Sequence, residues 1–218
     1  MNDDERGADR ERMVEHQLRR RGISHPTTLR ALGAVPRHAF IPPELRHRAY
    51  EDGPVGIECG QTVSQPWIVA TMTAALDMHP GEHVLEIGVG SGYQTAVLLE
   101  VGARVTGIER HGALARDAQA RLRSLGYRDF DIHIADGTLG WPGPGPFDGI
   151  LVAAAAPAVP PPLVAQLAPG GRLLIPVGDR KTQTLLCIEK QADGATTSRE
   201  LGAVVFVPLI GAEGFDTS

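Results

Sequence analysis

Three acidic residues in the middle of the chain stand where a small ligand would need them. Glu86 precedes the first of three alternating glycines, Glu109 lies 21 residues beyond Gly88, and Asp136 is followed by Gly137. Each lies near the end of a predicted strand, and open α/β sheets bind ligands at the carboxyl ends of their strands. A carboxylate at the position of Glu109 accepts hydrogen bonds from ribose hydroxyls in nucleotide-binding folds. Together they predict a ligand that contains a nucleoside and carries a positive charge.

Glycines at positions 88, 90 and 92 predict a loop that approaches this ligand closely. They follow an apolar run and precede helical spacing over Gln94–Val101. Glycine lacks a Cβ, so the backbone can turn tightly here and place the ligand near the N–H groups of the next helix. The spacing Gly-x-Gly-x-Gly is one residue shorter than the pyrophosphate fingerprint Gly-x-Gly-x-x-Gly. The residues that we expect to bind the ligand are Glu86, Gly88, Gly90, Ser91, Gly92, Glu109, Arg110, Asp136 and Gly137.

These features favour S-adenosylmethionine, which has an ammonium group, a ribose and a base that donates hydrogen bonds, and no phosphate. A nicotinamide dinucleotide is one alternative, since dehydrogenases share the strand, the glycine loop and Glu109. The early third glycine and Asp136 count against it. A second alternative is that the glycines only tighten a turn and the acidic residues cap helices. The glycines and the acidic residues all fall at the ends of successive predicted strands, and this joint placement disfavours the purely structural explanation.

The elements that must position these residues alternate along the chain. The predicted strands are the run through Val84, Leu85 and Ile87, then Arg104–Ile108, Asp131–Ala135, Phe147–Ala153, Gly171–Val177, Gln183–Lys190 and Arg199–Val207. The predicted helices are Arg10–Arg21, Pro26–Ala34, Trp67–Leu76, Gln94–Val101, Gly112–Leu125 and Pro160–Leu167. Such alternation predicts an α/β fold with one doubly wound, mostly parallel sheet of the Rossmann-like kind. We expect an N-terminal helical extension before it and an antiparallel strand pair at its C-terminal end.

The stretch Val35–Gln65 is irregular and rich in proline and glycine. Long segments of this kind in compact domains are usually lids or binding segments. We expect residues 1–65 to form the helical extension with a lid and substrate loop, and residues 66–218 to form the S-adenosylmethionine-binding domain. A chain of 218 residues that is 42% hydrophobic suits one globular unit containing both parts.

Composition argues against several classes of function. A net charge of -5 is unsuited to a nucleic-acid backbone. No apolar run approaches the roughly 20 residues of a membrane span, and the charged stretch Met1–Arg21 is unlike a secretory signal. Cys59 and Cys187 form no metal or redox motif, so we expect reduced thiols and a cytoplasmic protein. His79 and His83 flank a Pro-Gly turn and cannot face a metal from one helix, so no metal site is expected.

A set of short segments spread along the chain carries a family resemblance. They are Val35-Pro36-Arg37, Ala49-Tyr50, Gly60–Pro66, Leu85–Tyr93, Ala135–Gly137, Gly140–Pro142, Ala154–Pro157, Leu167–Leu173 and Phe206–Leu209. In this order they resemble the protein-L-isoaspartate O-methyltransferase family over about residues 13–211. The glycine loop alone is typical of methyltransferases in general, whereas the Gly-Gln-Thr-Val-Ser-Gln-Pro segment is far more specific and indicates the substrate.

The resemblance implies methyl transfer from S-adenosylmethionine to the α-carboxylate of an L-isoaspartyl residue in an aged protein, the start of repair through a succinimide. It implies that Ser64 is the active-site residue, whose hydroxyl donates to the substrate carboxylate. It also implies that Gln61, Thr62 and Val63 complete the substrate site. From the residues alone, Ser64 is better explained as a helix N-cap, because a proline at position 66 predicts a helix start.

Two aspects of the resemblance leave the substrate open. Glu58 and Cys59 stand where members of the family commonly carry smaller or aromatic residues, and we expect Glu58 to point into solvent because it would otherwise repel an anionic substrate. Some relatives methylate ordinary aspartate in a dedicated peptide, and a non-catalytic S-adenosylmethionine-binding module would share the same motifs. The expected partners are isoaspartyl-containing proteins and peptides, and the expected oligomeric state is a monomer.

Overall fold

A seven-stranded sheet forms the centre of the molecule in a computed structural model that describes residues 6–216. The strands are β3 (His83–Ile87), β4 (Arg104–Glu109), β5 (Phe130–Ile134), β6 (Phe147–Val152), β7 (Leu167–Gly178), β8 (Gln183–Lys190) and β9 (Thr196–Val204). Their order is β5-β4-β3-β6-β7-β8-β9, parallel from β5 to β7, with β8 antiparallel to both of its neighbours. The predicted mostly parallel, doubly wound sheet and its antiparallel C-terminal strands are confirmed.

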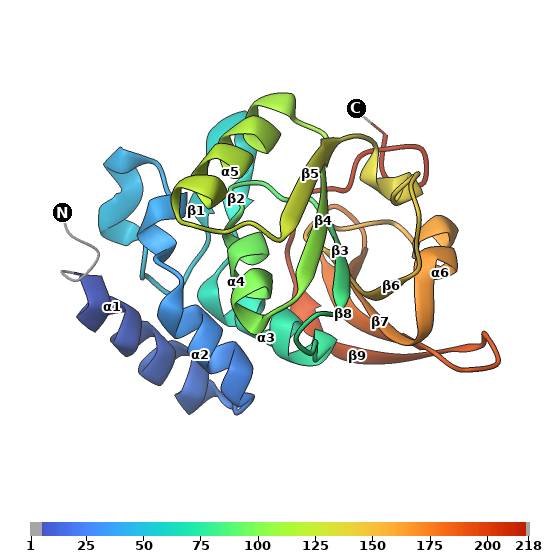
Figure 1. The fold of residues 1–218 in the computed structure, drawn as a ribbon, viewed down its shortest axis with the longest axis horizontal. Helices are drawn as coiled ribbons and strands as arrows, with labels where there is room; N and C mark the ends of the chain where they lie inside the picture. The colour runs from blue at the N-terminus through green and yellow to red at the C-terminus, as the bar shows by residue number, and fades with distance from the viewer. Residues whose placement is uncertain (1–5, 217–218) are drawn as a thin grey trace.

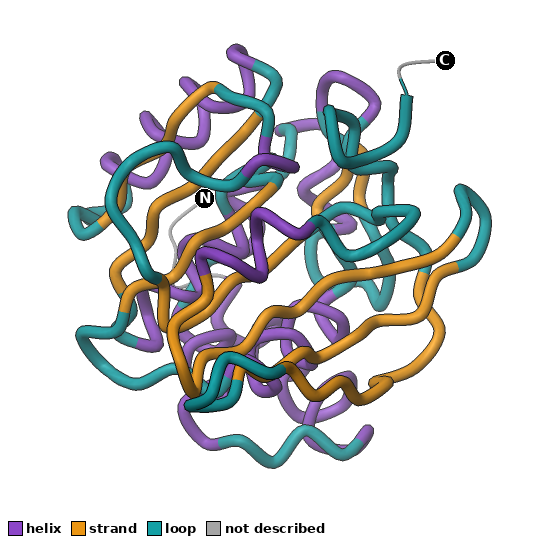
Figure 2. Tube along the Cα trace, turned by 90° about the vertical axis from the view of Figure 1, so that its right-hand side faces the viewer, coloured by secondary structure: helices purple, strands orange, loops and turns teal. Residues whose placement is uncertain are grey.

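Helices lie on both faces of the sheet (Figure 1). Helices α4 (Tyr93–Val101) and α5 (Gly112–Ser124) pack against β4 and β5, whereas α6 (Pro161–Gln166) packs against β7 on the other side. Helix α3 (Pro66–Leu76) precedes β3 and contacts β6 and β7. Figure 2 shows the same layers from the side, with the strands as one twisted sheet and the helices around it.

The strand order reverses next to β3, and this reversal positions the site. The chain runs from β3 outward through β4 and β5, then crosses back to add β6 and β7 on the other side. Ile87, at the end of β3, pairs with Ile108 of β4 and with Val152 of β6. The residues that follow these three strands therefore meet at one edge, and such a switch point is where open α/β sheets bind ligands.

The N-terminal extension is helical, as predicted, although its first helix is not uniform. α1 (Gly7–Arg12), η2 (Met13–Leu18) and η3 (Arg19–Arg21) continue one another as α-, π- and 3-10-helical turns. Residues 1–5 of the charged N-terminal stretch lie outside the described residues. α2 has the predicted bounds Pro26–Ala34, with proline at its first position and a hydrogen bond of 3.3 Å from the Thr28 N–H to His25 Nδ1.

The irregular stretch after α2 contains short elements that periodicity did not predict. They are η4 (Arg37–Phe40), η5 (Pro43–Arg48), β1 (Val55–Gly56), η6 (Glu58–Gly60) and β2 (Thr62–Val63). The two strands pair as an antiparallel hairpin, with Val55 opposite Val63. The hairpin turns at Cys59 and Gly60, both with positive φ. This hairpin carries the segment that the resemblance assigns to the substrate.

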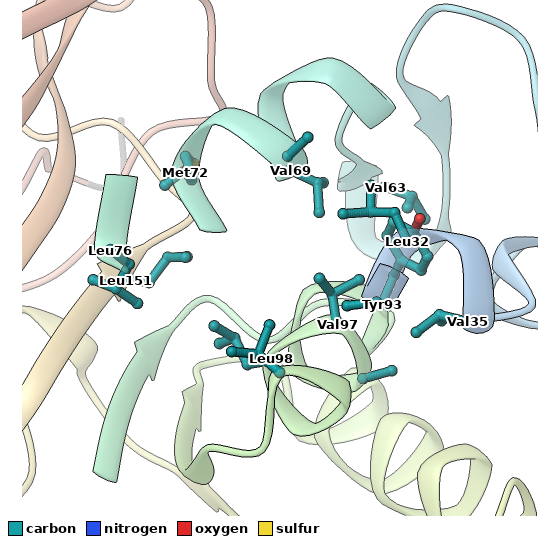
Figure 3. Close-up of a cluster of buried hydrophobic side chains, with 14 of the residues drawn as sticks. Leu32, Val35, Val63, Val69, Met72, Leu76, Tyr93, Val97, Leu98 and Leu151 are labelled. Atoms are coloured by element: carbon teal, nitrogen blue, oxygen red, sulfur yellow. The ribbon is translucent and has the colours of Figure 1, made fainter. Parts of the chain in front are cut away.

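One apolar cluster joins the N-terminal extension to the sheet domain (Figure 3). Leu32 of α2 and Val35 at the end of that helix are fully buried in this cluster. Tyr93 and Val97 of α4 and Val63 of the hairpin belong to the same cluster. Burying a side chain of this size contributes about 1.5–3 kcal/mol. The extension is therefore held against α4, the helix that begins directly after the glycine loop.

Candidate active site

A cavity of about 670 Å³ opens at the carboxyl edge of the central strands. It is lined by Ile87–Ser91 after β3, Ile108–His111 after β4, Gly137 after β5 and Ala153–Ala154 after β6. The Gln61–Gln65 segment lines it as well. Sites for small molecules and cofactors commonly have this volume. One cavity therefore joins most of the predicted cofactor residues to the predicted substrate residues, whereas Glu86, Gly92 and Asp136 are not part of its lining.

The glycine loop turns sharply at the cavity wall. The N–H of Gly88 donates to the Ile108 carbonyl at 2.8 Å, and φ is +85° at Gly88 and +55° at Gly90. Only glycine adopts such angles readily. Gly88, Gly90 and Ser91 line the cavity. Gly92 differs, because it is not part of the lining and a Cβ there would lie 3.3 Å from Ala118 Cβ of α5. The lack of a side chain at Gly92 therefore allows the loop to pack closely on α5.

Glu109 lies where the sequence predicts an acceptor for ribose hydroxyls. The residue is buried and lines the cavity at the end of β4. Its Oε2 accepts from the Gly90 N–H and its Oε1 from the His111 N–H, both at 2.9 Å. A carboxylate oxygen has lone pairs for more than one donor, so Glu109 can hold the loop and also accept from a ligand.

Glu86 is buried behind the cavity wall, which differs from the expected direct contact with an ammonium group. Its exposed fraction is 0%, it is absent from the cavity lining, and its Oε2 accepts from Thr95 Oγ1 of α4 at 2.6 Å. Burial, aided by the nearby charge of Glu109, raises the pKa of Glu86 to about 8. Side chains alternate across a strand, so Glu86 faces α4 when its neighbour Ile87 faces the cavity. Glu86 therefore lies behind the loop against α4, and its raised pKa favours the protonated form.

The end of β5 contributes a glycine and a carboxylate in different ways. Gly137 lines the cavity, and a Cβ there would lie 2.4 Å from Ile87 Cγ2, so only glycine fits. Asp136 accepts from the N–H groups of Thr138 and Ala212, at 2.9 and 2.8 Å. Burial would raise the pKa of Asp136, but these hydrogen bonds and the charge of Arg110 hold it below the ordinary value. Its carboxylate thus anchors the C-terminal loop beside the cavity.

The hairpin and the start of α3 form the opposite wall. Gln61, Thr62, Val63 and Ser64 all line the cavity. The N-cap of α3 is Gln65, and no side chain caps this helix end. The explanation of Ser64 as an N-cap is therefore wrong, and no hydrogen bond to the helix end occupies its hydroxyl. Glu58 was expected to point into solvent, and it is exposed and lies outside the cavity lining.

Sequence reasoning missed a third wall of the cavity. Residues 203–210, at and after the end of β9, line it with apolar side chains such as Val207 and Leu209. The predicted strand Arg199–Val207 ends three residues early, at Val204, because the Phe206 N–H donates to Gln183 Oε1 instead of continuing the ladder. The signal was present in the resemblance of Phe206–Leu209, but no residue there has reactive chemistry.

Among residues 6–216, no group of three or more His, Cys, Asp or Glu side chains could hold a metal ion. Within the same part of the chain, no helix is long and apolar enough to cross a membrane. Cys59 is an exposed free thiol and Cys187 a buried one.

Comparison with known proteins identifies close relatives along the whole chain. The family model for protein-L-isoaspartate(D-aspartate) O-methyltransferase matches residues 8–214. The chain is 49% identical over 213 residues to the protein-L-isoaspartate O-methyltransferase of Pelotomaculum thermopropionicum, covering 98% of this chain and 93% of that protein. It is 53% identical over 206 residues to the protein of the same name from Trichlorobacter lovleyi, covering 94% and 95%.

Solved structures resemble the fold as well as the sequence. A candidate protein-L-isoaspartate O-methyltransferase of Plasmodium falciparum, in complex with S-adenosyl-L-homocysteine, matches with a TM-score of 0.80 at 28% identity, covering 92% of this chain and 98% of that one. Another protein-L-isoaspartate O-methyltransferase matches with a TM-score of 0.82 at 27% identity, covering 94% of this chain and 67% of that one.

Proposed function

The chain belongs to the protein-L-isoaspartate(D-aspartate) O-methyltransferase family, and we propose that its cavity is where S-adenosylmethionine meets an isoaspartyl carboxylate. The enzyme transfers a methyl group from S-adenosylmethionine to L-isoaspartyl residues of damaged proteins, which begins their repair through a succinimide. The observation that carries this proposal is the single cavity that the glycine loop, Glu109 and Ser64 share.

The cofactor end of the cavity fits S-adenosylmethionine by the chemistry of its donors and acceptors. Gly88, Gly90 and Ser91 bring backbone close to a ligand, and Glu109 can accept from ribose hydroxyls. Gly137 leaves room at the end of β5, where the base would lie beside Arg110. We propose that Asp136 acts here mainly by anchoring the loop at Ala212. When bound, S-adenosylmethionine supplies an electrophilic methyl group on a sulfonium centre.

The substrate end requires little acid or base chemistry. A carboxylate with a reference pKa near 4 is already ionised at neutral pH, so its oxygen is a ready nucleophile. We propose that the Ser64 hydroxyl donates a hydrogen bond to this carboxylate and that Gln61 and Thr62 help to orient it. Neutral donors orient an anion without stabilising its ground state as strongly as an arginine would.

Catalysis at such a site comes chiefly from positioning and from exclusion of water. Two reacting atoms must approach to about 3 Å in line, and holding them there removes a large part of the barrier. The apolar wall that contains Val207 and Leu209 lines the same cavity as the polar Gln61–Ser64 segment. We propose that this wall keeps water away from the carboxylate, whose hydration would otherwise weaken its attack.

Labelled methyl transfer to paired peptides that differ only in isoaspartate or aspartate tests the function. In the isoaspartyl peptide the free carboxylate is attached directly to Cα, whereas in the aspartyl peptide it stands one methylene farther away. A misplacement of about 1 Å can lower the rate about 100-fold, so we expect a preference for isoaspartate of that order in kcat/KM. Equal kcat/KM values would point to a dedicated aspartyl substrate. The absence of transfer with measurable S-adenosylhomocysteine binding would point to a non-catalytic module.

The remaining features of this proposal concern the cellular setting. We propose a monomeric enzyme that acts in the cytoplasm on isoaspartyl-containing proteins and peptides. Two free thiols support a reducing compartment, and a net charge of -5 disfavours a nucleic-acid partner. We also retain the division into an extension of residues 1–65 and a domain of residues 66–218, which share the apolar cluster described above.

A further inference from the structure

Arg37 is a fully buried cation with no anionic partner among the described residues. Its exposed fraction is 0%, and no carboxylate of residues 6–216 forms an ion pair with it. Its Nη1 and Nη2 are buried and make no hydrogen bond of ordinary geometry within that range, and the Tyr93 hydroxyl is the polar group whose interaction most favours their charge. Removing an arginine charge from water is costly unless specific contacts compensate. Neither the cofactor site nor the substrate site described above explains why the charge of Arg37 is buried.

Two contacts hold the Arg37 side chain, and they lead to different parts of the molecule. Its Nε donates to the Ala49 carbonyl at 2.8 Å, and its guanidinium carbon lies 4.7 Å from the centre of the Tyr93 ring. A guanidinium over an aromatic face is attracted by the ring, and the attraction grows when both are desolvated. Burial lowers the pKa of Arg37, but Tyr93 opposes the shift, and arginine keeps its charge in proteins.

The Ala49 contact leads to the substrate segment. Val55 follows Ala49 by six positions, and its strand pairs with β2 so that Val55 lies opposite Val63. Ser64 follows Val63 directly. Gln17 also holds the turn at Ala49 and Tyr50, because its Nε2 donates to the Tyr50 carbonyl at 2.7 Å. The position of this turn therefore sets the position of the hairpin wall.

The Tyr93 contact leads to the cofactor loop. Tyr93 is the first residue of α4, is 1% exposed and also lines the cavity. Its N–H donates to Ser91 Oγ at 3.3 Å, so it is tied to the glycine loop. Figure 3 shows its ring extending from α4 toward Leu32 of α2 and Val35 at the end of that helix, two residues before Arg37. Moving this ring would move the loop.

We infer that Arg37 is a positioning residue, which sets the separation of the Ser64 segment from the glycine loop by holding the 49–50 turn and Tyr93 at once. The inference rests on the proposed function, since that separation matters only if the two walls bind two reactants. One planar guanidinium can donate in its plane to a carbonyl while its face stacks on a ring. A lysine ammonium has no such plane, so it cannot hold a carbonyl at its edge and a ring against its face in one fixed geometry.

Variants Arg37→Met and Arg37→Lys test the inference. We expect each to lower kcat for an isoaspartyl peptide about tenfold to 100-fold, because a misalignment near 1 Å has an effect of this size. The dissociation constants of S-adenosylhomocysteine and of the peptide, each measured alone by calorimetry, should change less than about threefold, since each wall stays intact. Rates are to be measured well below the melting temperature and expressed per folded molecule.

Arg10→Met is the matched control. Arg10 belongs to the same buried region, its Nε donates to the Gly33 carbonyl at 2.7 Å, and its Nη1 is also unpartnered. Its hydrogen bond goes to Gly33 rather than to Ala49, and it does not stack on the Tyr93 ring, which it reaches only through its charge. We expect a lower melting temperature with wild-type kcat. A purely structural Arg37 would give this same pattern in both Arg37 variants and would overturn the inference.

If Arg37→Met fails to fold, Tyr93→Leu tests the effect of the same contact on kcat. It removes the ring that the guanidinium contacts, so its kcat should fall, and the double variant with Arg37→Lys should fall no further. Additive losses would overturn the inference. Wild-type enzyme in the same assay separates the two proposals: no methyl transfer by wild type would defeat the proposed function, whereas active wild type with fully active Arg37→Lys would defeat only this one.

Discussion

Replacing Glu86 with glutamine should make the protein less sensitive to alkaline pH. Glu86 is 0% exposed, its Oε2 accepts from Thr95 Oγ1, and its Oε1 has no partner among the described residues. Burial raises its pKa from 4.5 to about 8 in the folded chain. The folded protein therefore keeps this proton over a range of pH in which the unfolded chain releases it.

The sign of the effect follows from this difference in bound protons. Below pH 4.5 both states are protonated and the acid has no pH-dependent effect. Between pH 4.5 and about 8 the unfolded state binds fewer protons, so the free energy of unfolding falls by up to about 1.4 kcal/mol per pH unit. Between pH 5 and 8 the wild type should lose about 3 kcal/mol through this residue, against a total stability of about 5–15 kcal/mol.

Glutamine cannot titrate, so Glu86→Gln removes this loss. Its buried amide adds an unpartnered donor that costs about 1–3 kcal/mol, but this cost is the same at every pH. Urea unfolding of both proteins at pH 5, 6, 7 and 8 and constant ionic strength should show a difference in stability that moves by about 3 kcal/mol in favour of the variant. The exposed Glu44→Gln gives the background for losing one charge elsewhere.

Two results would refute this reasoning. Parallel pH profiles for wild type and Glu86→Gln would mean that the folded protein does not hold the proton. A loss of S-adenosylhomocysteine affinity of about tenfold or more at pH 7 would mean that Glu86 contacts the cofactor as an anion. The buried position leads us to expect a change in affinity below about threefold.

Three further predictions test the site and the frame around it. Glu109→Ala should weaken S-adenosylhomocysteine binding about tenfold or more by calorimetry, because a lost acceptor in a buried site costs about 1–3 kcal/mol; unchanged affinity would remove this residue from the cofactor site. Ser64→Ala should lower kcat roughly tenfold to 100-fold, the value of a hydrogen bond to a charged group, with unchanged cofactor affinity and melting temperature, since this hydroxyl caps no helix; a lower melting temperature with full turnover would contradict it. Asp77→Asn should lower the free energy of unfolding at pH 7 by about 0.5–1 kcal/mol. Burial would raise the pKa of Asp77, but Arg172 at 2.9 Å and His25 hold it below 3.8, so this stabilisation is present above pH 3.8 and is lost as the pH falls through the lowered pKa; an equal loss across this pH range in urea unfolding would count against it.

The fold and the cofactor end of the site could be predicted because their signals are local. Strands and helices differ in the period of their apolar residues, and glycines with positive φ mark the loop wherever it lies. Glu109 ends its strand at the distance from Gly88 that the fold imposes, so its place at the cavity follows from spacing alone. The elements of the 35–65 stretch escaped prediction, because turns and two-residue strands have no periodicity.

Ser64 shows how one residue type can support two explanations until the chain is folded. A serine before Gln-Pro suits a helix cap as well as a substrate donor. The structure places Gln65 at the cap and leaves Ser64 on the cavity wall. Glu86 shows the converse, since its motif suggested a ligand contact and its strand places it against Thr95.

The sequence by itself therefore determined the class of fold, the glycine loop, the acidic residue at the end of β4 and the family to which the chain belongs. Only the tertiary structure decided that Glu86 faces a helix, that residues 203–210 close the cavity and that Arg37 meets Tyr93, 56 positions away along the chain. The physical reason is the distance along the chain over which each interaction acts. Backbone preferences and apolar periodicity act between near neighbours, whereas the direction of a side chain on a buried strand and the partner of a buried cation depend on how distant segments pack.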